Sequence, residues 1–363
     1  MLEIIFLITV SVYFIISVLL VIGAKRRFPV LSENELQSIS IVVAARNEEK
    51  NILSCLESLD KIIYPENKLE IIIVDDESTD STVTIVKEFI AHKSKFRLVG
   101  LSREEENLKG KVRAVAQGIR RAGGDIIVTT DADCEVNPMW AMTIGSYYQE
   151  NVAIVNGYTT ILSSNAFSGM QAIDFIYLLF VSAGTINLGQ PVSCIGNNMS
   201  FRKRVYIETG GFENLPFSVT EDFLLLNSIH KLNKYKLIYP LDKSTLVISK
   251  PSLTIGELFN QKKRWALGGI NAPVVGIFLM LWAFLTNCFV LLTPVFFSSV
   301  WLYMVLFKIA TDFFALVPIH QKLGLQKNLK YFPVFQFYFI IYTFVLPFVI
   351  LLNKKVKWKD RTY

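Results

Sequence analysis

The chain has 363 residues, of which 52% are hydrophobic and only 19% are charged. Charged residues make up about a quarter of an ordinary soluble domain, so this composition argues against a disordered chain, a coiled coil and a wholly soluble enzyme. Lys and Arg outnumber Asp and Glu by 37 to 31, an excess too small to indicate nucleic-acid binding. The four cysteines and three histidines lie far apart in the sequence, which argues against a disulfide framework, a structural zinc site and a His-based metal site.

The first apolar segment, Ile4 to Ile22, contains no charged residue. As a helix it would extend about 28 Å, close to the hydrocarbon thickness of a bilayer. Three basic residues, Lys25, Arg26 and Arg27, follow it at once, whereas a cleaved signal peptide carries its positive charge before the apolar run. We therefore expect an uncleaved transmembrane anchor over residues 1–24, with its C-terminal side in the cytoplasm.

Residues 25–270 are expected to form a cytoplasmic domain in which short apolar strands alternate with amphipathic helices. The predicted strands are Ile39–Ala45, Leu69–Val74, Phe96–Leu101 and Asp125–Thr130, and the predicted helices are Asn51–Leu59, Thr82–Ile90 and Lys111–Arg121. Strands that are apolar throughout suit a parallel sheet that is covered on both faces. This alternation predicts an α/β domain with a doubly wound, mostly parallel sheet, in which ligands bind beyond the carboxyl ends of the strands.

Polar residues gather where three of these strands end. They are Arg46-Asn47-Glu48, Asp75-Asp76 and Asp131-Ala132-Asp133. The sequence has neither GxGxxG nor GxxxxGK[ST], which disfavours a dinucleotide oxidoreductase and a P-loop ATPase. Acidic residues also cap helices, and Ser78 to Asp80 fits that role. Capping alone does not explain why acidic residues follow three of the four predicted strands. Asp131 and Asp133 are spaced to share one Mg²⁺ or Mn²⁺, which leaves coordination positions for substrate phosphates.

Apolar segments return after Pro273. Three of them are long enough to span a membrane: Val274–Leu292, Val295–Val317 and Tyr331–Leu352. Lys308 and Asp312 in the second segment are four residues apart and can pair on one helix face. Basic residues flank the third segment on both sides, at Lys322, Lys327 and Lys330 and at Lys354, Lys355, Lys357, Lys359 and Arg361. Residues 271–363 are therefore expected to be a membrane region of about three segments with a basic tail, in which the positive-inside rule leaves the side of the C-terminus open.

One further apolar run, Phe175–Val181, is too short to span a membrane by itself. The sequence leaves two alternatives open for it, a helix in the membrane interface and a piece of the domain core.

Taken together, the motifs resemble those of the family 2 glycosyltransferases, inverting enzymes of the GT-A fold that use nucleotide sugars. The matching pieces, in family order, are AARNEEKN at 44–51, VDDESTDST at 74–82, KGK at 109–111, DIIVTTDAD at 125–133, GNNMSFRK at 196–203, Gly210-Gly211-Phe212, Thr220-Glu221-Asp222 and Gln261-x-x-Arg264-Trp265. The resemblance covers about residues 39–270. It is to the membrane-bound branch, which includes cellulose and hyaluronan synthases, ceramide glucosyltransferase and bacterial lipid glycosyltransferases.

The resemblance implies a role for each motif residue. Asp222 would be the catalytic base, and Asp133 with Asp131 would bind the metal. The nucleotide sugar would be bound by Ala45, Glu48, Asp75, Asp76, Lys111 and Asp131, and the acceptor and diphosphate by Glu221, Gln261, Arg264 and Trp265. Carboxylates accept hydrogen bonds from ring N–H groups and sugar hydroxyls, arginine holds a diphosphate bidentately, and tryptophan stacks on sugars. The structural alternatives are a helix cap for Asp222, a solvated helix position for Lys111 and core packing for Trp265.

The expected activity is inverting transfer of a sugar from a nucleotide-diphosphate donor, with a UDP-sugar expected, to a lipid or lipid-linked acceptor. The expected cofactor is Mg²⁺ or Mn²⁺, and the expected place is a bacterial cytoplasmic membrane. A processive polysaccharide synthase is one alternative, disfavoured by the few C-terminal segments and by Cys194-Ile195-Gly196-Asn197, which departs from the Phe-Phe-Cys-Gly-Ser pattern of cellulose synthases. A catalytically inactive membrane scaffold is the other, and the intact motifs argue against it.

Overall fold

The structure, a computed structural model, describes residues 1–101, 108, 110–216, 218, 220–270, 272–352, 357–358 and 361–362. Lys109 of the KGK motif and Lys354, Lys355 and Lys359 of the basic tail lie outside the described residues. The chain divides into two compact units, each made of segments that are distant in the sequence. We call Arg26–Thr160 with Cys194–Lys250 the sheet unit, and Met1–Lys25, Ile161–Ser193 and Pro251–Tyr363 the helical unit.

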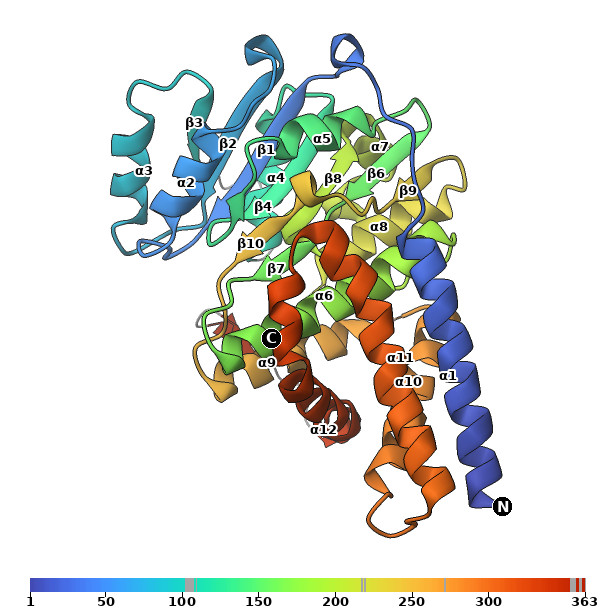
Figure 1. Cartoon of the computed structure of the whole chain (residues 1–363). Helices are drawn as coiled ribbons and strands as arrows, with labels where there is room; N and C mark the ends of the chain where they lie inside the picture. Colours follow the sequence, from blue (N-terminus) through green and yellow to red (C-terminus); the bar gives the residue numbers. More distant parts are fainter. Residues whose placement is uncertain are drawn as a thin grey trace. The chain divides into compact units, whose positions relative to one another are not determined.

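The sheet unit is built around a seven-stranded sheet of order β3-β2-β1-β4-β8-β6-β9 (Figure 1). Its strands are β1 (Ile39–Ala45), β2 (Leu69–Asp75), β3 (Phe96–Gly100), β4 (Ile126–Asp131), β6 (Val152–Asn156), β8 (Met199–Arg202) and β9 (Lys236–Ile238). The first four strands are parallel to one another, and β8 runs antiparallel to both β4 and β6. The predicted doubly wound, mostly parallel sheet is therefore confirmed.

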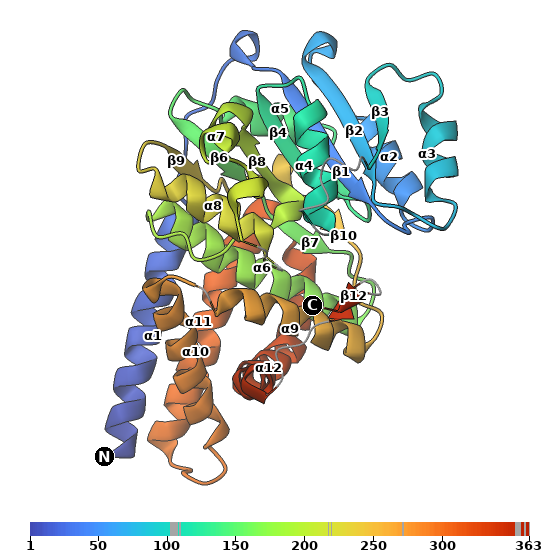
Figure 2. The same ribbon diagram turned by 180° about the vertical axis from the view of Figure 1, so that it is seen from behind.

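Helices cover both faces of this sheet, which is why its central strands are apolar throughout. Successive β1 residues Ile41, Val42 and Val43 point to opposite faces, and all three are fully buried. One face forms a core with the helices α2 (Ile52–Asp60) and α5 (Trp140–Ser146). The other face is covered by α4 (Lys111–Arg121), which Figure 2 shows in front of the sheet together with α8 (Glu221–Lys231). The helices α3 (Thr82–Ile90) and α7 (Lys203–Glu208) complete the layers.

A second, three-stranded sheet of order β5-β10-β7 lies next to the DxD motif. Its strands are β5 (Glu135–Val136), β7 (Thr159–Ile161) and β10 (Val247–Ser249). Strand β5 follows Asp133 after one residue and pairs antiparallel with β10. The end of β10 is therefore brought beside a motif that precedes it by more than a hundred residues.

The helical unit consists of α1 (Leu2–Ala24), α6 (Ala166–Asn187), α9 (Ile255–Gly269), α10 (Val274–Leu291), α11 (Ser299–Leu323) and α12 (Phe332–Leu352). Helix α1 packs against α6, α10 and α11, and α12 contacts α6, α9 and α10; Figures 1 and 2 both show α1, α10 and α11 side by side. Within the described part of the chain, five of these helices, all except α9, are long and apolar enough to cross a membrane.

Helix α6 differs from the sequence prediction. The apolar run Phe175–Val181 belongs to a longer helix of 22 residues. The polar residues that interrupt its apolar pattern, among them Gln171 and Asp174, are buried inside the helical unit. Of the two alternatives, the structure favours core. The compact units consequently divide the predicted 25–270 domain, since residues 161–193 and 251–270 group with the apolar helices.

Candidate active site

The loops that follow β1 and β2 are bound to each other at the carboxyl edge of the large sheet. The Asn47 backbone N–H donates to Ser78 Oγ (3.1 Å), and Asn47 Oδ1 accepts from the Thr79 backbone N–H (2.8 Å). Asn47 and Glu77 have φ angles of 51° and 58°, a left-handed conformation that is uncommon for residues other than glycine. Such backbone strain is concentrated at functional sites, and here it marks the edge where the sequence predicts ligand binding.

Glu48 is buried in the first of these loops. Its backbone N–H donates to Thr82 Oγ1 (2.8 Å), and its carboxylate accepts from Asn51 Nδ2 (2.7 Å). The loop position of Glu48 is thus fixed from both its backbone and its side chain.

Asp75 and Asp76 have different surroundings. Both carboxylate oxygens of Asp75 lie 3.3 Å from the backbone nitrogen of Ser78 and accept its N–H, which closes the turn after β2. Asp76 is buried, and its backbone N–H donates to the Ala45 carbonyl (2.8 Å). The N-cap position of α3 belongs to Ser81, and within the predicted capping segment Ser78 to Asp80 it is Asp80 whose Oδ1 accepts from the Thr82 backbone N–H (3.0 Å).

Lys111, the first residue of α4, brings three motifs together. Its Nζ forms an ion pair with Asp131 of the DxD motif. Burial lowers the pKa of Lys111, but the nearby charges of Asp131, Glu221 and Asp222 outweigh this and raise it above its usual value. The side chain is only 23% exposed, so Lys111 is a largely shielded cation between DxD and TED rather than a solvated helix residue.

Glu221 and Asp222 lie in the first turn of α8. The N-cap position belongs to Thr220, so Asp222 is not the capping residue. Asp222 Oδ1 accepts the Phe223 backbone N–H (2.8 Å). A Cβ atom on Gly196 would lie 3.3 Å from Asp222 Oδ2, so the GNNMSFRK motif begins with a glycine where the chain passes the carboxylate closely.

The DxD carboxylates lie above two buried thiols. The Cys55 thiol donates to the Asp131 carbonyl (3.6 Å), and the Cys134 thiol donates to Asp133 Oδ1 (3.5 Å). Burial raises the pKa of both cysteines, and the nearby aspartates add to the shift, which keeps both thiols neutral at physiological pH. They are weak donors that support the DxD turn.

A divalent cation fits the DxD residues. Among the residues that the structure describes, no group of three or more His, Cys, Asp and Glu side chains is arranged as a metal site. Mg²⁺ and Mn²⁺ do not require one when one or two carboxylates hold the ion and substrate phosphates and water complete its coordination. Asp133 and Asp131 offer that donor set, although Asp131 is shared with Lys111.

Gln261, Arg264 and Trp265 all lie on α9 of the helical unit, each partly exposed. The Trp265 ring packs on Phe175 of α6, with ring centroids 5.3 Å apart, so the core-packing alternative describes one of its contacts. The neighbouring Lys262 lies over the same indole ring, 4.6 Å from its centroid, and pairs with Asp174 of α6. The sequence pattern did not single out this lysine.

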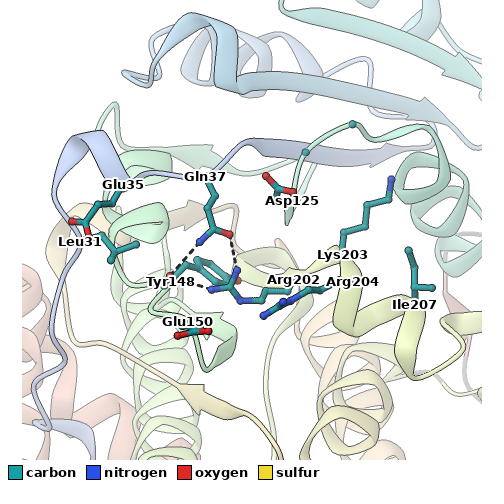
Figure 3. A pocket seen from close by; sticks show the side chains of 12 residues that line it. Leu31, Glu35, Gln37, Asp125, Tyr148, Glu150, Arg202, Lys203, Arg204 and Ile207 are labelled. Atoms are coloured by element: carbon teal, nitrogen blue, oxygen red, sulfur yellow. Dashed lines mark hydrogen bonds between the residues drawn. The ribbon is translucent and has the colours of Figure 1, made fainter.

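A pocket of about 620 Å³ lies at the opposite edge of the sheet unit. Its residues come from the segments that precede β1 and β4 and from the end of β8 (Figure 3). Arg202 points into this region, but its guanidinium donates hydrogen bonds to neighbouring protein groups. The acceptors are Gln37 Oε1 (2.6 Å) and the carbonyls of Tyr148, Gln149 and Val152 (3.1, 2.8 and 2.7 Å). The pocket holds none of the predicted site residues.

Comparison with known proteins finds glycosyltransferases among the curated relatives. Among curated relatives, the probable glycosyltransferase YdaM of Bacillus subtilis is 27% identical over 264 residues, 70% of this chain and 60% of YdaM. Poly-β-1,6-N-acetyl-D-glucosamine synthase of Staphylococcus aureus is 27% identical over 287 residues, 77% of this chain and 66% of the synthase. The chain therefore spans about three fifths to two thirds of the length of these relatives.

The solved mannosyltransferase PcManGT from Pyrobaculum calidifontis, in complex with GDP-Man and Mn²⁺, has the same fold. It is 17% identical, has a TM-score of 0.59, and the match covers 93% of this chain and 99% of PcManGT. The family model "Glycosyl transferase family 2" matches residues 40–210, and "Glycosyl transferase family group 2" matches residues 126–352. Since the second model alone covers more than half of the sequence, the chain belongs to the family 2 glycosyltransferases.

Proposed function

We propose that this enzyme transfers a sugar from a nucleotide-diphosphate donor to a lipid or lipid-linked acceptor at a membrane, with inversion at the anomeric carbon. The observation that carries the proposal is the cluster around Lys111, which is paired with Asp131 of DxD and lies close enough to Glu221 and Asp222 of TED for their charges to raise its pKa. Groups suited to a leaving diphosphate and a base suited to an acceptor hydroxyl thus occupy one site of the sheet unit.

On the donor side, the residues must bind a nucleoside and offset the negative charge that grows on the departing diphosphate. We assign the nucleoside and ribose to Ala45, Glu48, Asp75 and Asp76, and the diphosphate to Lys111 and Arg264. Asp133, with Asp131, would hold Mg²⁺ or Mn²⁺, and such an ion supplies Lewis-acid stabilisation of the phosphate oxygens. The Mn²⁺ and GDP-Man of PcManGT support this part of the proposal.

On the acceptor side, Asp222 is the base. It takes the proton of the acceptor hydroxyl while that oxygen forms the new bond to the anomeric carbon and the bond from this carbon to phosphate oxygen breaks. The electron pair of the broken bond leaves with the nucleoside diphosphate. Because Asp222 is assigned as the base and no second carboxylate is assigned as a nucleophile, a single displacement follows, and the product is inverted. Glu221, Gln261 and Trp265 are assigned to acceptor binding.

The membrane part of the proposal rests on the helical unit. The QxxRW helix α9 belongs to the same compact unit as the five apolar helices, which supports an acceptor that is itself held in a membrane. The basic residues Lys25, Arg26 and Arg27 after α1 support a cytoplasmic sheet unit. Protease added outside sealed spheroplasts is expected to leave the sheet unit intact, and cleavage within it would reverse this orientation.

A polysaccharide synthase is the second candidate. The 27% identity to poly-β-1,6-N-acetyl-D-glucosamine synthase supports it. The two functions share the chemistry of the sheet unit and differ in what happens to the product.

The decisive experiment supplies the purified full chain, in detergent with native lipid extract, with a panel of radiolabelled UDP- and GDP-sugars. A lipid glycosyltransferase puts the label into the organic phase, whereas a polymerase yields labelled material of high molecular weight. Absence of donor turnover over the whole panel, with lipid extract present, would contradict both.

The variant Asp222→Asn tests the mechanism. Transfer is expected to fall by about 10²–10⁴-fold, because a positioned carboxylate base contributes about that much, while the donor dissociation constant stays close to that of the wild type. Isothermal titration with the donor and a transfer assay separate the two quantities. Wild-type transfer by this variant, or a product that retains the donor's anomeric configuration, would show that Asp222 is not the base.

A further inference from the structure

We propose that Lys250 is a donor-binding residue that contacts the diphosphate of the nucleotide sugar. The inference rests on the proposed function and adds to it a residue that belongs to none of the motifs. It starts from the pairing of β5 with β10, in which Val247 lies opposite Val136 and Ile248 opposite Glu135.

Lys250 follows the last residue of β10, and Asp133 is separated from the first residue of β5 by Cys134 alone, so both residues lie at the same end of this antiparallel pair. A side-chain hydrogen bond between Ser249 and Cys134 holds the two segments together one residue before β5. Lys250 therefore lies at the end of the small sheet that is next to the DxD turn, which we assign to the metal and the diphosphate.

The side chain of Lys250 reaches the loop that follows β1. Its Nζ donates to Asn51 Oδ1 (2.8 Å), and Asn51 Nδ2 in turn donates to Glu48 Oε2 (2.7 Å). The Asn51 backbone N–H also donates to the Glu48 carbonyl (2.8 Å). The ammonium group is thus held at the Glu48 loop, which we assign to the nucleoside, on a segment that follows the strand paired beside the DxD motif, which we assign to the diphosphate. In a nucleotide sugar the diphosphate follows directly after the nucleoside, so it extends from the Glu48 loop toward the DxD motif.

The charge of Lys250 also fits this position. Lys111 is paired with Asp131, and Arg113 lies 3.6 Å from Glu77. The partner of Lys250 is a neutral amide, and no carboxylate of the described residues lies within 4.0 Å of its Nζ. An ammonium group has three donors; one is used by Asn51, and the others are available to phosphate oxygens. A half-buried cation held by an amide at an acidic edge is placed to receive the anionic part of the donor.

The test compares nucleotides that differ by one phosphate. UDP, UMP, GDP and GMP are titrated with Mn²⁺ into the full chain in detergent, and the pair that the wild type binds is used further. Lys250→Met is expected to weaken binding of the diphosphate about tenfold or more, as expected for loss of a charge-assisted hydrogen bond, with a much smaller effect on the monophosphate. Lys250→Arg is expected to keep most of the affinity, and Lys87→Met, an exposed lysine on α3, is the matched control.

A purely structural role predicts a different pattern. If Lys250 only supports Asn51, then Asn51→Ala will reproduce Lys250→Met, and both nucleotides of the pair will weaken equally. Our proposal requires Asn51→Ala to keep the preference for the diphosphate, and this variant stays informative even if Lys250→Met does not fold. Repeating the titrations in EDTA must preserve the effect of Lys250, since the contact is direct. Equal diphosphate binding by wild type and Lys250→Met overturns this inference alone, whereas a wild type that binds none of the nucleotides overturns the proposed function with it.

Discussion

The two units use charged side chains in opposite ways. At the carboxyl edge of the sheet unit, Asp131 and Lys111 form a pair that is 33% and 23% exposed. Inside the helical unit, Lys308 and Asp312 of α11 form a pair 2.8 Å apart in which both side chains are at most 1% exposed. The spacing of these two residues predicted the pair, and the structure confirms it.

The buried pair is completed by neighbouring helices. Asp312 accepts from Tyr13 of α1 and from Gln336 of α12, each at 2.5 Å, and Lys308 Nζ donates to Gln336 Oε1 (3.2 Å). A second buried pair, Asp174 with Lys262, joins α6 to α9. Charges in an apolar interior are tolerated only when paired and hydrogen-bonded. The comparison teaches that a Lys–Asp pair stabilises helix packing where both side chains are buried, and is available for ligand binding where the side chains stay partly exposed.

The largest expected effect is a loss of activity at the partly exposed DxD site without a loss of stability. Asp133→Asn should lower transfer by about 100-fold or more, because a bound metal ion contributes several kcal/mol to such a reaction, while the melting temperature stays close to the wild-type value. Transfer assays and thermal melting on the same preparation check this. Addition of EDTA to the wild type should imitate the variant, and full activity in EDTA would remove the metal from the proposal.

The reverse pattern is expected for the enclosed pair. Lys308→Met leaves Asp312 as an uncompensated buried charge, which costs about 3–5 kcal/mol of stability. The double variant Lys308→Met/Asp312→Leu removes both charges and should recover a large part of the loss. Thermal melting in detergent measures both. If the single variant were as stable as the wild type but inactive, α11 would belong to the active site, and the comparison would fail.

The smallest effect is expected for an exposed pair of the sheet unit. Lys93 pairs with Asp60, and their side chains are 32% and 31% exposed. Exposed pairs contribute about 0–1 kcal/mol, and Lys95 lies 3.1 Å from the same carboxylate. Lys93→Met should therefore change the free energy of unfolding by no more than about 1 kcal/mol. Transfer activity should stay at the wild-type level. A larger loss would mean that partial exposure is a poor guide to the role of a charge in this protein.

The parts of the fold that repeat a strong pattern were predictable from the sequence. The predicted limits of β1, α3 and α4 agree with the structure, because long apolar runs and regular helical spacing are local properties of the chain. Strand β8 has only four residues, Met199–Arg202, and its antiparallel position depends on neighbours far away in the sequence. Helix α6 was shortened in the prediction because Asp174 breaks its apolar run, and only tertiary structure supplies the partner Lys262.

The candidate site shows the same division. Motif spacing identified Lys111, Asp131 and Asp222, but not that one cation would join them. Lys250 follows a three-residue strand, and its neighbourhood with Asn51 arises from a pairing across more than a hundred residues. A pattern within one segment cannot report such a contact.

The contact between α1 and α6 has a consequence for biosynthesis. A Cβ atom on Gly23 would lie 2.4 Å from the Gly184 carbonyl oxygen, and Asn187 Nδ2 donates to the Gly23 carbonyl (3.0 Å), so the two helices touch through their backbones. Helix α1 is synthesised about 140 residues before α6, and from Ile4 to Ile22 it contains no charged residue that would need a partner from another helix. Helix α6 carries Asp174 and depends on Lys262 of α9, which is synthesised later still. The helical unit can therefore close only near the end of translation, and Asp174 lacks its lysine partner until α9 has been synthesised.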